Sequence, residues 1–101
     1  MKDVHEIFTM FKAEFPTINE RQEALGLAIH DDGGPLPAPT RWLIKLAISA
    51  AGGHQRSLET HVAAAREAGA TEAEIQHALL LLIPTCGFPA FMEAYSTYKG
   101  R

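Results

Sequence analysis

The sequence contains one cysteine, Cys86, in 101 residues. A single thiol cannot form a disulfide within the chain, so neither a disulfide framework nor a two-cysteine redox cycle within one chain is available. Basic residues are also few, since nine Lys and Arg stand against twelve Asp and Glu, and no basic patch stands out. We therefore expect no nucleic-acid partner, because surfaces that bind nucleic acid concentrate positive charge.

Long apolar runs are missing as well. No run reaches the roughly 18–20 residues that a membrane-spanning helix requires. The stretch 1–6 is too polar for a signal peptide. These absences predict a cytoplasmic protein without a membrane partner.

Alternation of apolar and polar residues, which marks a strand, is absent too. Apolar residues instead recur at helical spacing, which predicts an all-α fold of about six helices in a single domain, residues 1–101. The Gly- and Pro-rich segment 31–39 is expected to be a linker. The predicted helices span about residues 4–15, 17–30, 40–50, 54–68, 72–82 and 88–98.

Several residues are suited to begin or end these helices. Ser, Thr and Asp accept hydrogen bonds from free N–H groups at a helix start, and Gly adopts the left-handed conformation that often follows a helix. Pro84 and Gly87 should bend or end the fifth helix. The predicted caps are Asp3 for the first helix, a Thr17–Glu20 capping box for the second, Gly69 after the fourth and a Thr71–Glu74 capping box for the fifth.

The chain carries more apolar helix surface than one small domain can hide. The runs 43–51 and 78–83 are almost wholly apolar, and a short chain has little private core. We therefore expect an oligomer, with the 43–51 run in the interface, because a helix that is apolar nearly all round must be buried.

One polar stripe interrupts the apolar helices. On a helix that begins at His54, the residues His54, Ser57 and His61 share one face, at i, i+3 and i+7. His61 is the favoured catalytic residue, because imidazole exchanges protons near neutral pH. Two alternatives are a Ser57–His61 nucleophile and base pair, which lacks an evident orienting carboxylate, and a metal site of His54, Glu59 and His61, whose spacing is unfavourable. The simplest alternative is a polar pocket lining or helix contact without chemistry.

Two further residues are candidates for the lining of the same pocket. Trp42 is expected in the core or the pocket wall. Cys86 follows Pro84, which should leave free backbone groups near the pocket, but a lone thiol in apolar company is more often a buried small hydrophobe than a nucleophile.

Four segments in order resemble the carboxymuconolactone decarboxylase family, which includes the alkylhydroperoxidase D-like proteins. They are residues 43–52, the helix of His61, residues 68–75 and residues 86–90, and the resemblance covers about residues 20–98. It implies an alkylhydroperoxidase D-like helical fold, a homotrimer or homohexamer, and a small-molecule substrate. We expect no cofactor and no metal.

The resemblance also implies what has been lost. The redox branch uses a Cys-x-x-Cys pair, a His four residues after the pair and a Glu twelve residues before its first Cys. In this chain His54 and Ser57 take the two cysteine positions. His61 keeps the histidine, and Trp42 stands where the Glu would be. The chain is thus more similar to the decarboxylase branch, which implies acid/base chemistry by His61 on a small carboxylate or lactone. His54, Ser57, Trp42 and Cys86 would contact the substrate. The alternatives are a non-catalytic binding or structural homologue, and peroxiredoxin activity, which is disfavoured because His and Ser form no disulfide.

Overall fold

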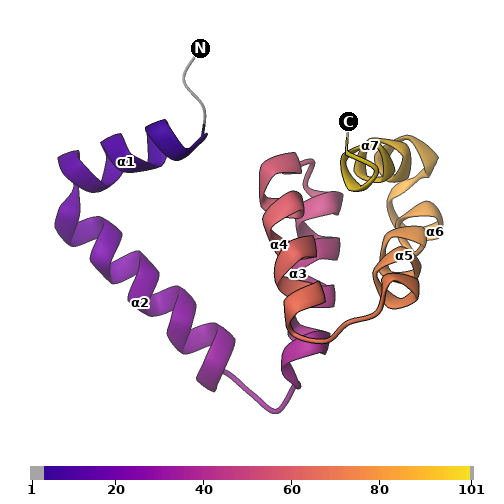
Figure 1. The fold of residues 1–101 in the computed structure, drawn as a ribbon, viewed down its shortest axis with the longest axis horizontal. Coiled ribbons are helices and arrows are strands. Elements are labelled where there is room, and N and C mark those ends of the chain that lie inside the picture. Colours follow the sequence, from indigo (N-terminus) through magenta and orange to yellow (C-terminus); the bar gives the residue numbers. More distant parts are fainter. Residues whose placement is uncertain (1–3, 101) are drawn as a thin grey trace. The chain divides into compact units, whose positions relative to one another are not determined.

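Helices account for all of the regular structure in the computed structural model, which describes residues 4–100 of the chain. This confirms the predicted all-α class. The described residues form seven helices rather than about six (Figure 1): α1 Val4–Glu14, α2 Pro16–Asp32, α3 Ala38–Ala51, α4 Gln55–Glu67, α5 Glu72–Leu80, α6 Leu82–Cys86 and α7 Phe88–Tyr98.

The additional helix arises where the predicted fifth helix divides into α5 and α6. Pro84 cannot donate a backbone hydrogen bond, and its ring would collide with the carbonyl four residues earlier, at Leu80. The helix accordingly ends at Leu80, passes through a turn at Leu81 and resumes for five residues.

The start of the second helix differs from the prediction. The Thr17–Glu20 capping box does not form, because α2 begins one residue earlier, at Pro16, and Phe15 occupies the N-cap position without a side-chain cap. A proline in the first helical turn costs little, because its missing N–H would have had no intrahelical partner. The predicted Asp3 cap lies outside the described residues.

The other two predicted caps are confirmed. Thr71 accepts a 3.1 Å hydrogen bond from the Glu74 N–H, and Glu74 Oε1 accepts a 2.8 Å bond from the Thr71 N–H. After α4, Gly69 adopts a φ of +104°. This lets the Ala70 N–H reach the Ala65 carbonyl at 2.9 Å, which closes the helix.

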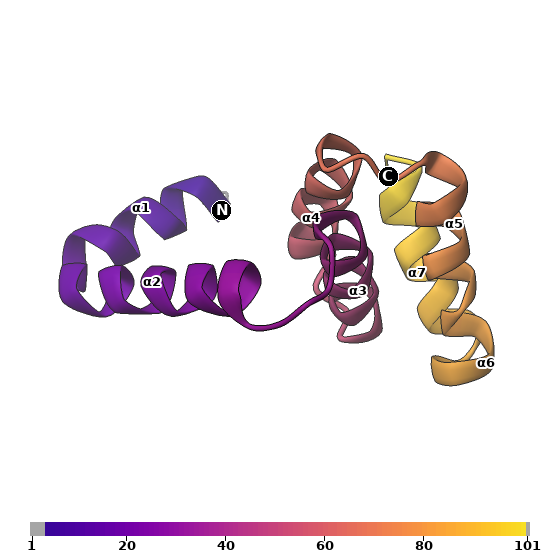
Figure 2. The same ribbon diagram turned by 90° about the horizontal axis from the view of Figure 1, so that it is seen from below.

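Contacts divide the chain into two compact units, one up to Pro35 and one from Leu36 on. In the second unit α3 and α4 lie side by side, and α5 lies beside α7 (Figures 1 and 2). All five helices contribute to one apolar core, whose fully buried members hold α3 and α4 against α5. The largest of them are Leu46, Leu58, Ile75 and Leu79.

The first unit has no comparable core. Among residues 5–35, the only buried residue is Asn19, whose side chain bonds Glu23 and Gln22. Its large apolar side chains are exposed, including Leu25 at 61% and Ile29 at 63%. This unit therefore exposes apolar surface that a partner could cover. None of the helices formed by residues 4–100 is both long and apolar enough to cross a membrane.

A polar cluster joins three helices at the surface of the second unit. Arg66 of α4 donates to both carboxylate oxygens of Glu72, the first residue of α5, at 2.6 and 2.9 Å. Tyr98 of α7 donates to the same carboxylate at 2.8 Å. The hydrogen bond from Arg66, followed by that from Tyr98, lowers the pKa of Glu72 to about 2.

This pKa makes the contribution of Glu72 to stability depend on pH. The carboxylate is favoured in the folded state, so its contribution is fully present above the unfolded-state pKa of about 4.3 and is lost as the pH falls through the folded-state value. We expect Glu72→Gln to lower the free energy of unfolding at pH 7, and the difference from the unmodified protein to shrink as the pH falls from about 5 toward 2. Urea unfolding across this range measures it, with Glu59→Gln on exposed α4 surface as the control. A difference that does not vary with pH would contradict the assignment.

Candidate functional site

His61 is held by a hydroxyl on the neighbouring helix. Its Nδ1 lies 2.9 Å from Oγ of Ser49, across the α3–α4 pair. Ser49 is 6% exposed and His61 is half-buried. A buried hydroxyl needs a hydrogen-bond partner, so this bond both satisfies Ser49 and fixes the orientation of the His61 ring.

Two more side chains of α3 complete a cluster around this pair. Trp42, Lys45 and Ser49 stand at i, i+3 and i+7, so they form one stripe of α3. The Trp42 ring centre lies 5.6 Å from that of His61, and Lys45 Nζ lies 4.3 Å from the Trp42 ring centre. The cluster thus combines an imidazole, a hydroxyl, an ammonium group and an indole wall.

The turn between α3 and α4 sets the register of the Ser49–His61 pair. Gly53 has a φ of +75°, which lets its N–H reach the Ala50 carbonyl at 3.2 Å and the His54 N–H reach the Ser49 carbonyl at 2.9 Å. A side chain larger than hydrogen at Gly53 would be strained in this conformation. The turn therefore reverses the chain within three residues of α3.

His54 belongs to this turn rather than to the helix. The prediction of a helix that begins at His54 is wrong by one residue, because His54 precedes α4 with φ −89° and ψ 79°. Its ring packs against Gly52, where an added Cβ would lie 2.8 Å from His54 Cδ2. The single-face geometry therefore applies only to Ser57 and His61.

The structure brings together some of the predicted site residues and separates others. The Trp42 ring contacts that of His61, but Trp42 does not line either of the two described pockets. His54 lines a small pocket of about 10 Å³ together with Ser49 and Glu93. Ser57 is exposed, and neither Ser57 nor His61 is among the residues that line the two described pockets.

Cys86 is exposed at the end of α6. The interpretation of its thiol as a buried small hydrophobe is therefore wrong. The reason is the brevity of α6, which buries Leu82 alone. Cys86 does not line either described pocket.

Sequence reasoning missed Lys45 and Ser49. A signal for both was present, because they are the polar residues within the otherwise apolar run 43–51 and they share a face with Trp42. That they lie near His61 could not be predicted from their spacing in the sequence, because this proximity depends on how α3 packs against α4.

The cluster contains an imidazole and a hydroxyl, which are groups that can exchange protons. A hydroxyl both donates and accepts, so Ser49 can partner either neutral tautomer of His61. Among the described residues, no three His, Cys, Asp or Glu side chains are grouped closely enough to hold a metal ion.

Comparison with protein families matches residues 16–98 to the carboxymuconolactone decarboxylase family. The match runs from the first residue of α2 to the last residue of α7 and spans both compact units. The chain therefore belongs to this family, which confirms the resemblance found over about residues 20–98. Comparisons with curated proteins and with solved structures gave no match.

The single exposed thiol leads to a prediction about redox chemistry. We expect no dithiol-dependent reduction of hydroperoxides, because a disulfide cannot form within the chain and His54 and Ser57 supply no thiol. A coupled assay with a dithiol donor measures this, with and without Cys86→Ser. Robust turnover that disappears in Cys86→Ser would contradict the prediction and would require a disulfide to another chain or to a small thiol.

Proposed function

We propose that the chain performs non-redox acid/base chemistry on a small carboxylate or lactone, with His61 as the proton carrier. The observation that carries the proposal is the 2.9 Å hydrogen bond between His61 Nδ1 and the buried Ser49 hydroxyl. Membership of the carboxymuconolactone decarboxylase family supports it. We also propose a homotrimer or homohexamer, since both compact units expose large apolar side chains.

The hydroxyl of Ser49 suits a histidine that gains and loses a proton. When Ser49 Oγ accepts from Nδ1–H, the lone pair is on Nε2, which is then the basic nitrogen. Protonation at Nε2 leaves the Nδ1–H donor unchanged, so the Ser49 bond persists in the imidazolium form. His61 can therefore act as base and then as acid without turning its ring.

Lys45 favours an anionic substrate. Its ammonium group lies beside Trp42, whose ring contacts His61, so it places a positive charge on the same stripe of α3. A carboxylate bound at this cluster would stabilise the imidazolium form of His61. In this proposal His54, Ser57 and Cys86 contact the substrate only if it extends beyond the cluster, because they lie on exposed surface.

Calorimetry tests the proposal. Succinate and a five-membered lactone carboxylate are titrated near pH 7 in two buffers with different ionisation enthalpies. We expect a buffer-dependent heat that corresponds to uptake of up to about one proton per site. Binding with the same heat in both buffers would contradict acid/base linkage, and an absence of binding by either compound would contradict the substrate class.

A second candidate function is a non-catalytic ligand-binding or structural homologue. The observation in its favour is that His61 does not line either of the described pockets. In that case a ligand binds without proton uptake and without turnover, and the same titration distinguishes the two functions.

A further inference from the structure

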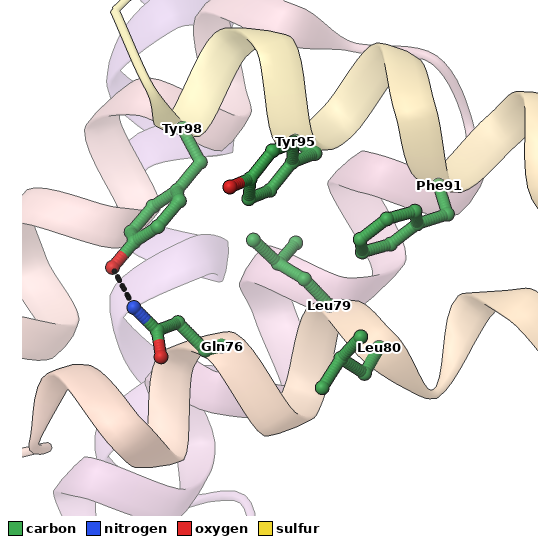
Figure 3. Close-up of a pocket in the computed structure, with 6 residues that line it drawn as sticks. All are labelled: Gln76, Leu79, Leu80, Phe91, Tyr95 and Tyr98. Atoms are coloured by element: carbon green, nitrogen blue, oxygen red, sulfur yellow. Dashed lines mark hydrogen bonds between the residues drawn. The ribbon is translucent and has the colours of Figure 1, made fainter.

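A second pocket lies between α5 and α7, outside the Ser49–His61 cluster. Its volume is about 190 Å³, and none of its lining residues belongs to α3 or α4. Figure 3 shows side chains of the two helices facing one another across it. The lining consists of Gln76, Leu79, Leu80, Phe91, Tyr95 and Tyr98.

The walls of this pocket, which we call the slot, are largely apolar. On α7 the rings of Phe91 and Tyr95 are stacked, with centres 5.5 Å apart and planes 19° apart. Leu79 and Leu80 of α5 form the opposite wall (Figure 3). Aromatic and aliphatic walls together favour a small apolar ligand such as an aromatic ring, because both kinds of side chain make dispersion contacts with it.

One end of the slot is polar. Gln76 Nε2 donates to the Tyr98 hydroxyl at 3.2 Å, and Tyr98 in turn donates to Glu72. The Tyr95 hydroxyl lies toward the same end (Figure 3) and has no hydrogen-bond partner among the described residues. A ligand hydroxyl could therefore bond Tyr95 while its ring stays in the slot.

Size and charge restrict the ligand further. A cavity of about 150 Å³ lined by aliphatic and aromatic side chains holds benzene, so this pocket has room for one six-membered ring with a small substituent. The lining carries no side chain that is charged at neutral pH, and an unpaired charge is costly to desolvate. We propose that the α5–α7 pocket binds an uncharged monocyclic aromatic compound that bears a hydroxyl group, as phenol does.

Phenol titration followed by amide NMR tests this binding site. We expect saturable shifts confined to α5 and α7. Leu80→Trp, at a rim position that is 48% exposed, should fill the slot and weaken phenol binding at least about fivefold. Leu81→Trp is the matched control, because Leu81 is also exposed, at 54%, but does not line the pocket; it should retain phenol binding.

The polar end has its own test. Tyr95→Phe keeps the stacked ring and removes the hydroxyl, so it should weaken phenol binding about threefold and leave toluene binding unchanged. Three results would overturn the proposal. The first is amide shifts that do not saturate with phenol. The second is an equal loss of phenol affinity in Leu80→Trp and Leu81→Trp. The third is the same amide shifts when the protein is diluted without phenol, which would assign this face to a second copy of the chain.

Discussion

Replacing His61 with alanine is expected to abolish the proton uptake that accompanies carboxylate binding and to slow any turnover of a lactone carboxylate by orders of magnitude. The half-buried imidazole is the group that would accept the proton, with Ser49 holding its Nδ1 at 2.9 Å. General acid/base groups typically contribute 10²–10⁴-fold to rate, so turnover should fall by about this factor. Calorimetry in two buffers measures the uptake, and product formation measures the rate.

Two controls separate chemistry from structural damage. Ser57→Ala should preserve proton uptake, because Ser57 is exposed and its hydroxyl is not the partner of His61 Nδ1. Ser49→Ala should keep part of the uptake but change its pH profile, since it removes the partner of Nδ1. Full uptake in His61→Ala would end the catalytic interpretation and leave the binding or structural function.

Placing a charge at Ile48 is expected to dissociate the oligomer. Ile48 is 64% exposed and Ile44, one turn earlier, is 42% exposed, so α3 presents an apolar ridge opposite its buried residues. Burying a carboxylate there without a partner costs several kcal/mol, and about 3 kcal/mol corresponds to roughly a 100-fold weaker association. Sedimentation velocity of Ile48→Glu at micromolar concentration should show a much larger fraction of the 11.0 kDa monomer.

The matched control is Ala63→Glu, which adds the same charge to exposed surface of α4. It should leave association unchanged, and circular dichroism should show the same helix content in both variants. If the unmodified chain is already an 11.0 kDa monomer at micromolar concentration, the predicted oligomer is wrong. If Ile48→Glu associates normally, the 43–51 run lies outside the interface.

The helices were predictable because their signals are local. The Thr71–Glu74 box and the break near Pro84 depend on residues a few positions apart, and the structure agrees with both. The start of α2 was misplaced because Pro16 and Thr17 are both suitable first-turn residues, and the proline prevailed.

The site was predictable in part. His61 could be selected from its chemistry and its position in the family, but its partner Ser49 is twelve residues away on another helix. Such a contact depends on how α3 and α4 pack, which periodicity does not determine. His54 was placed on the helix because Gly52 and Gly53 could either interrupt or end the preceding one. The left-handed Gly53 ends it and keeps His54 in the turn.

The tight reversal at Gly53 also affects how the protein folds. Because it joins α3 to α4 directly, the contact between Ser49 and His61 closes a short loop, and short loops cost little chain entropy. Contacts of this kind form early, so the α3–α4 hairpin should acquire amide protection during refolding before α7 docks on it. The cluster around His61 would then be assembled first, and the remaining helices of the second unit would pack against a hairpin whose parts are already in register.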